Sequence, residues 1–516
     1  MGNIPMAPST CWQGSPTNNG RSPAIAHWFM PLLLKFPLLL ACTLLASPIT
    51  HAQTLPASVS EALARAKIPS DAVALLVLEA DGKTPARLSH RATVRMNPAS
   101  VMKLVTTSAA LDLLGPAFVW RTPVWVDGPV VAGLLKGNLV IQGQGDPKLV
   151  LERLWLLLHR LQGLGIYTIA GDIVLDRRAF NVPATDPAEF DGEPLRPYNA
   201  APDALLINFK SLLMTFTPNA LGHTAQVQFE PPLWGLQHPA SVPMIATNNI
   251  ASNACGNYRA ALKADYSEAT RVRFNGNYPQ ACGEKVWAVA YADPASYNAR
   301  AIEGLWRSMG GKLRGTVRDG IAPALPASFE FSSPTLAEVI RDINKFSNNV
   351  MAQQVFMTLG LPRQSDKELS NPGSNAASTP ESSRAAVRQW WLRRISSTDV
   401  PEIDNGSGLS RRNSISAQAL GHLLLLAYAA PWMPELISSL PIVGMDGTLK
   451  NSRAAAGSAH LKTGSLRDVS TIAGYADGAS GKRYIVVAMV NHANAAAARP
   501  ALDALLEWTV VDNQSQ

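Results

Sequence analysis

The stretch NPASVMKLVTTSAALDLLGP, residues 97–116, is the segment from which the fold is predicted. Asn97 can cap a helix, the following proline suits its first turn, and the glycine–proline pair at its end stops it. Within the predicted helix, Ser100 and Lys103 lie three residues apart, nearly one turn, so both side chains share a face. A lysine partly removed from water there can lose its proton and act as the base for the serine. Taken alone the pair is a weak indication, because a surface lysine one turn after a capping-type serine has the same spacing.

A second polar motif stands where a loop is expected to enter a helix. In KFSNNVMAQQ, residues 345–354, Ser347 and Asn349 flank Asn348 at this junction. Serine and asparagine are favoured at helix starts, so the motif by itself indicates no more than a helix cap.

A third motif interrupts an apolar strand. In AHLKTGSL, residues 459–466, Lys462, Thr463 and Gly464 follow one another. A lysine in such a strand must reach solvent or hold an anion, and a glycine weakens the strand unless a partner needs close approach to its backbone. The stretch therefore predicts a negatively charged ligand that lies along the strand edge.

Together the three motifs are far more specific than any one of them. They occur in the order Ser-x-x-Lys, Ser-Asn-Asn and Lys-Thr-Gly on a helix start, a loop and a strand, which closely matches the set found in penicillin-binding proteins and related β-lactamases. The sequence resembles the D-alanyl-D-alanine carboxypeptidases/endopeptidases among the low-molecular-mass class C penicillin-binding proteins. The segments DNGSGLSRRNSIS (404–416) and LPIVGMDGTLKNS (440–452) are also similar to that family. The sequence departs from the family at Asn348, where aspartate is frequent.

The resemblance implies an α/β (α+β) fold, with a penicillin-binding/β-lactamase-like serine transpeptidase domain that carries a long, mostly β insertion. Ser100 and Ser347 are 247 residues apart (347 − 100), a much wider gap than in simpler members of the superfamily. Between them the sequence changes to short strands, turns and scattered prolines. We therefore expect a catalytic domain built from residues 53–118 and 326–516, and one or more accessory domains inserted at 119–325.

Local patterns predict the elements of the catalytic domain. Helices are expected at 59–66, 97–116, 335–360, 384–395 and 417–430, and strands at 71–80 and 85–91. Residues 470–478 and 482–492 predict an antiparallel hairpin that follows the strand at 459–466, and the polar segment 363–383 predicts a loop. The inner stripe of the first long helix is expected to consist of Val101, Leu104, Ser108 and Leu111.

The resemblance also implies the roles of the motif residues in an acyl transfer. Ser100 would attack the carbonyl between two terminal D-alanines, and Lys103 would take its proton. Ser347, held near Lys103, would relay a proton to the leaving amine, and Asn349 would hold the backbone amide of the substrate. The oxyanion would lie between the backbone N–H groups of Ser100 and Ser465.

Further residues are expected to bind the substrate. Lys462 and Thr463 would receive the terminal carboxylate, and Gly464 would let the peptide lie antiparallel against the strand with no Cβ in its way. Asp176 and Arg411 match family positions that help hold the side chain of the dibasic residue of the peptide, although a solvated surface charge is an alternative for each. No metal or cofactor is expected.

The N-terminus predicts export. Residues 1–52 contain the apolar run WFMPLLLKFPLLLACTLLAS (28–47) and small residues before position 53, which is typical of a signal peptide. A membrane anchor is the alternative, but the clean run after Lys35 is too short to span a bilayer, and Met30 is an alternative start. The expected location is the periplasm or another extracytoplasmic space.

Composition excludes some partners. The chain has 516 residues, 47% hydrophobic and 16% charged, with a formal net charge of +7. No run of lysine or arginine occurs, so nucleic acid is not an expected partner. The mild basic excess favours anionic polymers or a membrane surface, which includes peripheral membrane association.

Export changes how the cysteines are interpreted. Without residues 1–52 only Cys255 and Cys282 remain, and in an oxidising compartment a disulfide between them is expected. Two unrelated free thiols are the alternative.

Three functions are compatible with these motifs. The preferred one is a serine DD-peptidase that removes the terminal D-alanine from peptidoglycan stem peptides, cleaves their D-alanyl cross-links, or both, and that β-lactam antibiotics acylate. The alternatives are a hydrolase that destroys β-lactam drugs and a wall-binding scaffold without catalysis. The first alternative gives the long insertion no purpose, and the second has no need of Ser100, Lys103 and Lys462 together.

Overall fold

The computed structural model describes residues 54–219, 221–245, 255–362 and 376–512. The predicted export segment and most of the predicted polar loop, residues 363–375, lie outside these ranges. Within them, no helix combines the length and the apolar character that a membrane crossing requires.

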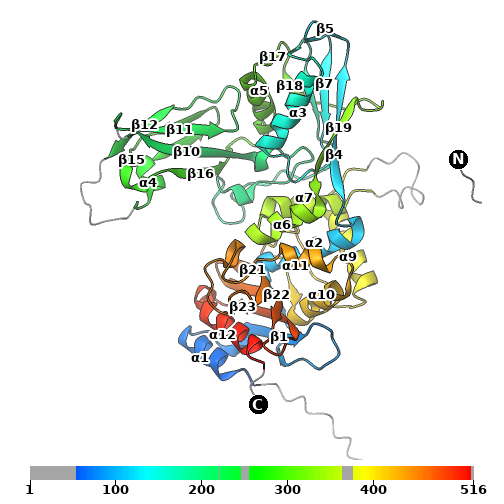
Figure 1. The fold of residues 1–516 in the computed structure, drawn as a ribbon, viewed down its shortest axis with the longest axis vertical. Coiled ribbons are helices and arrows are strands. Elements are labelled where there is room, and N and C mark those ends of the chain that lie inside the picture. The colour runs from blue at the N-terminus through cyan, green and yellow to red at the C-terminus, as the bar shows by residue number, and fades with distance from the viewer. Residues whose placement is uncertain (1–53, 220, 246–254, 363–375, 513–516) are drawn as a thin grey trace, which may run out of the picture. The chain divides into compact units, whose positions relative to one another are not determined.

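A five-stranded antiparallel sheet forms the centre of the catalytic part (Figure 1). Alternate side chains of β1 enter two different apolar clusters, one shared with α10 and the other with α1 and α12, because successive strand residues point to opposite faces. The strand order is β2 (Leu88–His90), β1 (Val73–Glu79), β23 (Arg483–Asn491), β22 (Val469–Asp477) and β21 (Ala459–Leu466). The helices are α1 (Ala57–Arg65), α10 (Ala417–Ala429) and α12 (Arg499–Val510). The predicted hairpin and the strand before it are confirmed.

The other half of the catalytic part is helical. It consists of α2 (Lys103–Leu114), α6 (Leu336–Phe346), α7 (Asn349–Leu359), α9 (Pro380–Arg394) and α11 (Met433–Ser439). Residues 99–102 form a 3-10 turn that leads directly into α2. Every residue from Lys103 to Leu111 is buried, so the predicted single inner stripe is too narrow. The helix is enclosed on all sides because α6, α7, α9 and the 3-10 turn all contact it. A short bridge, β3 (Arg95–Met96) with β20 (Ile415–Ser416), joins the segment before this turn to the segment 404–416.

The inserted segment contains two five-stranded sheets, a four-stranded sheet and a two-stranded sheet, in agreement with its expected β character (Figure 1). One five-stranded sheet has the order β18 (Val317–Asp319), β9 (Ile173–Asp176), β7 (Asn138–Gln142), β4 (Val119–Asp127) and β19 (Phe329–Thr335). The other five-stranded sheet has the order β15 (Tyr278–Pro279), β12 (Ser241–Ile245), β11 (Thr224–Glu230), β10 (Ser211–Asn219) and β16 (Lys285–Ala290). The helices are α3 (Leu151–Gly163), α4 (Tyr258–Leu262) and α5 (Tyr297–Ser308), and the remaining strands are β5 (Val130–Val131), β6 (Leu134–Leu135), β8 (Thr168–Ile169), β13 (Ala264–Glu268), β14 (Arg271–Phe274) and β17 (Lys312–Leu313).

The inserted segment has an apolar core of its own, drawn from residues between Val124 and Phe329. Its last strand, β19, pairs with its first, β4, so that Thr335 lies opposite Val119. The sheet therefore extends ten residues beyond the predicted boundary at residue 325. We call residues 119–335 the insertion.

Cys255 and Cys282 form a disulfide, as predicted. It links the segment before α4 to the short turn before β16, within the insertion.

Candidate active site

Ser100 and Lys103 meet at the start of α2. Ser100 lies in the 3-10 turn, where Asn97 Oδ1 accepts a hydrogen bond from the Ala99 N–H at 2.9 Å. Lys103 is fully buried. Its Nζ contacts Ser100 Oγ at 3.0 Å, Asn349 Oδ1 at 2.6 Å and the Ser407 carbonyl at 2.5 Å. The predicted pair is thus brought together, and Asn349 joins it from α7.

The environment of Lys103 favours its neutral form. Burial, and then the positive charge of Lys462, lower the pKa of Lys103 well below 10.5. In the described part of the chain no carboxylate forms an ion pair with either amine. Lys103 can therefore accept a proton from Ser100, the property that a base in this position needs.

The Ser-Asn-Asn motif forms the break between α6 and α7. Ser347 ends α6 in a left-handed conformation with φ of 56°. Asn348 caps α7, because its Oδ1 accepts a hydrogen bond from the Met351 N–H at 3.0 Å. The capping role anticipated for the motif thus belongs to its middle residue, and asparagine serves it as well as aspartate. Ser347 and Asn349 reach the site on either side of the cap.

Lys462 is also fully buried, and it contacts Ser347. Its Nζ donates to Ser347 Oγ at 2.9 Å and to the Thr463 carbonyl at 2.7 Å. Burial lowers the pKa of Lys462 from 10.5 to about 7. The sequence predicted that this amine reaches solvent or holds an anion, and that Ser347 is held near Lys103. In the structure the Lys462 amine is buried and bound to Ser347, and the charge of Lys462 is close enough to Lys103 to lower its pKa.

Gly464 allows β21 to approach the turn that carries Ser100. A Cβ at this position would lie 2.3 Å from Thr471 Oγ1, 2.6 Å from the Pro98 carbonyl oxygen and 2.9 Å from the Ser100 nitrogen. These are atoms of the protein, so the space that Gly464 keeps open is taken by the Ser100 turn. The predicted reason for the glycine, room for a substrate, is therefore not the one that the structure gives. The neighbouring Thr463 hydroxyl contacts Thr448 Oγ1 at 2.8 Å.

A large groove opens over these residues. It has a volume of about 1670 Å³ and is lined by Ser100, Ser347, Asn349, Arg411 and Ser465 of the catalytic part. The insertion contributes the opposite wall. The groove thus brings five of the predicted site residues to one surface, and the two buried lysines support it from behind.

Arg411 and Asp176 have different outcomes. Arg411 lines the groove, pairs with Asp468 and lies 5.7 Å from the centre of the Phe190 ring. Asp176 is buried in β9, where it accepts hydrogen bonds from Gln142, Arg178 and Ala322. Burial opposes its ionisation, but these hydrogen bonds lower the pKa of Asp176 to about 2. Its carboxylate stabilises the insertion and does not line the groove, so its expected role in substrate binding is wrong.

Two other acidic residues of the insertion line the groove. Asp191 and Glu193 line the groove next to Phe190. Asp191 accepts hydrogen bonds from the Tyr198 hydroxyl at 2.8 Å and from Asn199 Nδ2 at 2.9 Å. Burial opposes its ionisation, yet these bonds lower the pKa of Asp191. The loop sequence carried no spacing signal that would have selected these residues.

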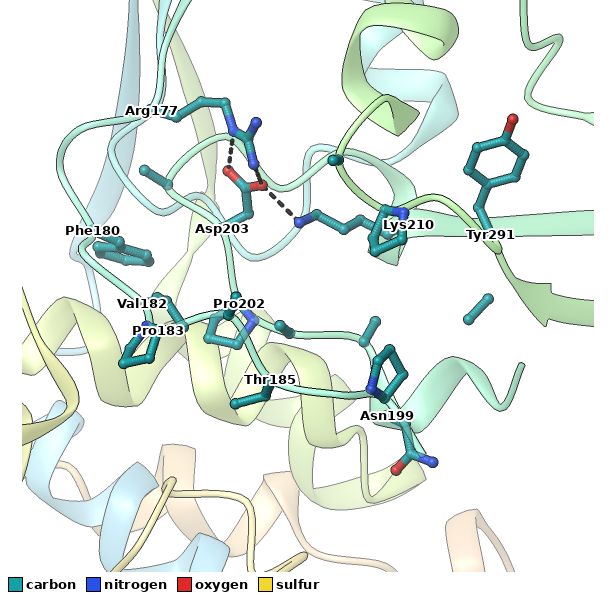
Figure 2. A pocket seen from close by; sticks show the side chains of 18 of the residues that line it. Arg177, Phe180, Val182, Pro183, Thr185, Asn199, Pro202, Asp203, Lys210 and Tyr291 are labelled. Carbon is teal, nitrogen blue, oxygen red and sulfur yellow. Dashed lines mark hydrogen bonds and ion pairs between the residues drawn. The ribbon is translucent and has the colours of Figure 1, made fainter. Parts of the chain in front are cut away.

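The insertion is fastened to the helix that carries Asn349. Figure 2 shows Arg177 and Lys210 converging on Asp203; Lys210 Nζ lies 2.8 Å from its carboxylate. The Asp203 backbone N–H donates to Gln354 Oε1 and its carbonyl accepts from Gln354 Nε2, both at 2.8 Å. Because Gln354 belongs to α7, the ion-paired loop and the catalytic helix hold each other in place.

Among the described residues, no group of three or more His, Cys, Asp or Glu side chains is arranged so that it could hold a metal ion.

Comparison with known proteins identifies relatives over most of the chain. The model of the D-Ala-D-Ala carboxypeptidase 3 (S13) family matches residues 55–510. The D-alanyl-D-alanine carboxypeptidase of Actinomadura sp. (strain R39) is 28% identical over 406 residues, which are 75% of this chain and 71% of that protein. The D-alanyl-D-alanine carboxypeptidase DacB of Haemophilus influenzae is 25% identical over 416 residues, 77% of this chain and 80% of its own length.

Solved structures show the same fold. Penicillin binding protein 4 (dacB) from Haemophilus influenzae has a TM-score of 0.65 at 22% identity and covers 87% of this chain and 99% of its own. The same protein complexed with a β-lactam has a TM-score of 0.60 at 22% identity, over 84% of this chain and 93% of its own. The expected α/β fold, with its penicillin-binding domain and long insertion, is confirmed.

Proposed function

This chain belongs to the D-Ala-D-Ala carboxypeptidase 3 (S13) family, and we propose that it is a serine DD-peptidase acting on peptidoglycan stem peptides. The observation that carries the proposal is the contact of 3.0 Å between Ser100 Oγ and the buried amine of Lys103. A serine hydroxyl becomes a nucleophile when a neutral base is within hydrogen-bond reach. Burial supplies that base here.

The acyl transfer follows from this contact. Ser100 Oγ attacks the carbonyl carbon of the penultimate D-alanine while its proton passes to Lys103. The backbone N–H groups of Ser100 and Ser465 face the developing oxyanion. The C–N bond then breaks, and the leaving amine takes a proton from Ser347, which Lys462 holds at 2.9 Å. The proton that Lys103 received from Ser100 then restores the Ser347 hydroxyl, so that Lys103 is neutral again. A water molecule hydrolyses the ester, releases the shortened peptide and restores the Ser100 hydroxyl.

The substrate is bound along the edge of β21. The first half of this edge is occupied, since Leu461 N–H donates to the Pro441 carbonyl, whereas Ser465 lies in the groove. Asn349 holds the substrate amide, and Thr463 binds the terminal carboxylate. The buried amine of Lys462 does not touch the substrate carboxylate; it attracts the carboxylate by its positive charge from behind Ser347.

The side chain of the dibasic residue lies between Arg411 and the acidic loop, by which we mean the segment that carries Asp191 and Glu193. We assign the acidic partner to Asp191 or Glu193, which line the groove together with Arg411. Arg411 receives a carboxylate on this side chain, and the acidic loop receives its ammonium group.

A β-lactam is expected to acylate Ser100, since it presents a strained amide and a carboxylate in the arrangement of the terminal dipeptide. Action on the cell wall places the enzyme outside the cytoplasm. Cleavage of a signal peptide at about residue 52, a periplasmic location and peripheral membrane association complete the proposal; the mildly basic composition supports the last of these.

Intact-mass measurement over time tests the function. Incubation with a β-lactam should give a stoichiometric, long-lived adduct on the peptide that contains Ser100, with loss of D-alanine release while it lasts. Ser100→Ala should abolish both, at a cost of about 1 kcal/mol in stability for the lost hydrogen bond with Lys103. Ser108→Ala is the matched control, because this buried hydroxyl lies on the same helix and has no hydrogen-bond partner among the described residues.

The other outcomes identify the alternatives. Rapid β-lactam turnover without an adduct would indicate a drug hydrolase. The absence of both adduct and turnover would indicate a scaffold, and an adduct on another serine would refute the assignment of the nucleophile.

A further inference from the structure

The groove extends far beyond the reaction centre. At about 1670 Å³ it exceeds the roughly 300–1,000 Å³ typical of small-molecule sites. Its lining continues from Ser100 and Ser465 to Trp287 on β16 and Tyr266 on β13. The terminal dipeptide accounts for only the end next to Ser100.

The distal end of the groove has an aromatic wall. The rings of Tyr266 and Tyr258 meet Trp287 edge to face, with centroids 6.0 and 6.5 Å apart. The Arg259 guanidinium lies 5.6 Å from the Trp287 centroid. Trp287 and Tyr266 are partly exposed to the groove, and Asn257 and Arg259 stand exposed at its rim. This end of the groove therefore presents an apolar ring surface that is bordered by hydrogen-bond donors.

We propose that this wall binds the glycan chain of the peptidoglycan substrate, an inference that rests on the proposed DD-peptidase function. The C–H faces of a pyranose ring are apolar and pack on aromatic rings, while the hydroxyl and N-acetyl groups bond to a polar rim. Of the residues that α4, β13 and β16 contribute to the groove in the described chain, Arg259 alone carries a charge. Such a surface suits a neutral sugar polymer.

The stem peptide separates the sugar from the reaction centre. Four residues separate the scissile bond from the sugar, and an extended peptide of that length spans roughly 14 Å. A substrate acylating Ser100 therefore places its sugar well outside the catalytic residues. Since the groove is continuous, the peptide can occupy the near part while the sugar reaches the insertion.

A second peptide strand is a poorer occupant of the same wall. β16 is the edge strand of its sheet, and an extended peptide could pair only with a free edge. The Val286 carbonyl already accepts from the Tyr258 hydroxyl, and the Ala290 N–H already donates to the Leu195 carbonyl. Both ends of the edge are thus occupied, which leaves ring stacking as the main interaction.

The test compares Trp287→Ala with wild type on two substrates: a glycan-free pentapeptide ending in D-alanyl-D-alanine, and the same pentapeptide attached to glycan strands. We expect kcat/KM on the glycan-linked substrate to fall about tenfold, the effect of one lost stacking contact, mainly through KM. Activity on the free pentapeptide should stay within about twofold. Trp155→Ala is the matched control, since Trp155 is 41% exposed on α3 and stacks on His159 outside the groove; it should change neither activity.

Binding of chitotetraose, followed by saturation-transfer NMR, provides a second readout. Wild type and Trp155→Ala should give signals, and Trp287→Ala should lose them, while Trp287→Phe retains part of them. Arg259→Gln gives an independent test if Trp287→Ala does not fold, and it should weaken glycan-linked turnover alone. Equal losses on both substrates would indicate a peptide-binding or structural role and overturn the proposal, as would unchanged turnover of both or no chitotetraose signal from wild type. If wild type cleaves neither substrate, the DD-peptidase function fails, whereas chitotetraose binding still decides the glycan site.

Discussion

Replacing Gly464 with alanine should disable acylation while the protein still folds. The added Cβ would meet Thr471 Oγ1 at 2.3 Å, the Pro98 carbonyl oxygen at 2.6 Å and the Ser100 nitrogen at 2.9 Å. Two of these atoms belong to the backbone and cannot turn away. Thr471 is held as well, because its hydroxyl donates to the Pro98 carbonyl at 2.8 Å. The strand and the Ser100 turn must therefore separate.

The size of the effect follows from that separation. Ordinary contact between heavy atoms requires about 3.5 Å, so the turn moves by on the order of 1 Å. A displacement of this size at a catalytic group costs roughly a hundredfold in rate, and overpacking costs about 1–3 kcal/mol in stability. Lys103, which follows the turn on α2, would lose its alignment with the displaced serine.

Acylation kinetics with a fluorescent penicillin, together with thermal melting, measure both quantities. Gly163→Ala is the control, because no described atom outside the adjacent residues and the backbone of α3 lies within 4 Å of a Cβ at this position. Its acylation rate should equal that of wild type. A wild-type acylation rate in Gly464→Ala would refute the reasoning, since it would show that the turn adapts without moving Ser100.

Three further outcomes are expected. The pKa of Lys462 is about 7 in the folded protein and ordinarily 10.5, so between these values the unfolded chain holds one more proton and the free energy of unfolding should rise with pH from about 7 to 10. Denaturant titrations should show a shallower rise for Lys462→Met than for wild type, and equal slopes would contradict this. Arg411→Ala and Asp191→Asn should raise KM several-fold for a peptide with a dibasic residue, but not for a peptide with a neutral residue at that position. Asp176→Asn should instead lower the melting temperature, and a rise in its KM for the dibasic peptide alone would contradict the assignment. Thiol counting on the denatured, unreduced mature protein should find no free thiol, and two free thiols would contradict the disulfide. Loss of the Cys255–Cys282 disulfide should cost about 3.5 kcal/mol for its 27-residue separation.

Much of the fold could be predicted because its signals are local. Near the C-terminus, strands follow one another with short turns between them, so β21, β22 and β23 pair with their neighbours in sequence. The Ser100–Lys103 spacing needs only one helical turn, so its contact was predictable as well. Asn348 separates two helices because it caps the second, and capping residues can be recognised from sequence.

The failures concern contacts between distant segments. Nothing within AHLKTGSL shows that Ser347, 115 residues earlier, covers the Lys462 amine. The reason for Gly464 depends on a turn more than 360 residues away. Asp176 and Asp191 look alike in sequence, since both are acidic residues of the insertion. Only the packing of β9 buries the first and leaves the second in the groove.

The pairing of Val119 with Thr335 has a consequence for how the chain reaches its native state. The catalytic part must bring together segments that flank the insertion, whose paired ends are 216 positions apart (335 − 119). Closing a flexible loop of that length costs roughly 5 kcal/mol in chain entropy. Because the insertion has its own core and its first and last strands are neighbours, it can fold first and deliver the two ends side by side. The catalytic half then assembles around a short, preformed junction, and changes in the length of the insertion's outer loops leave that junction unaffected.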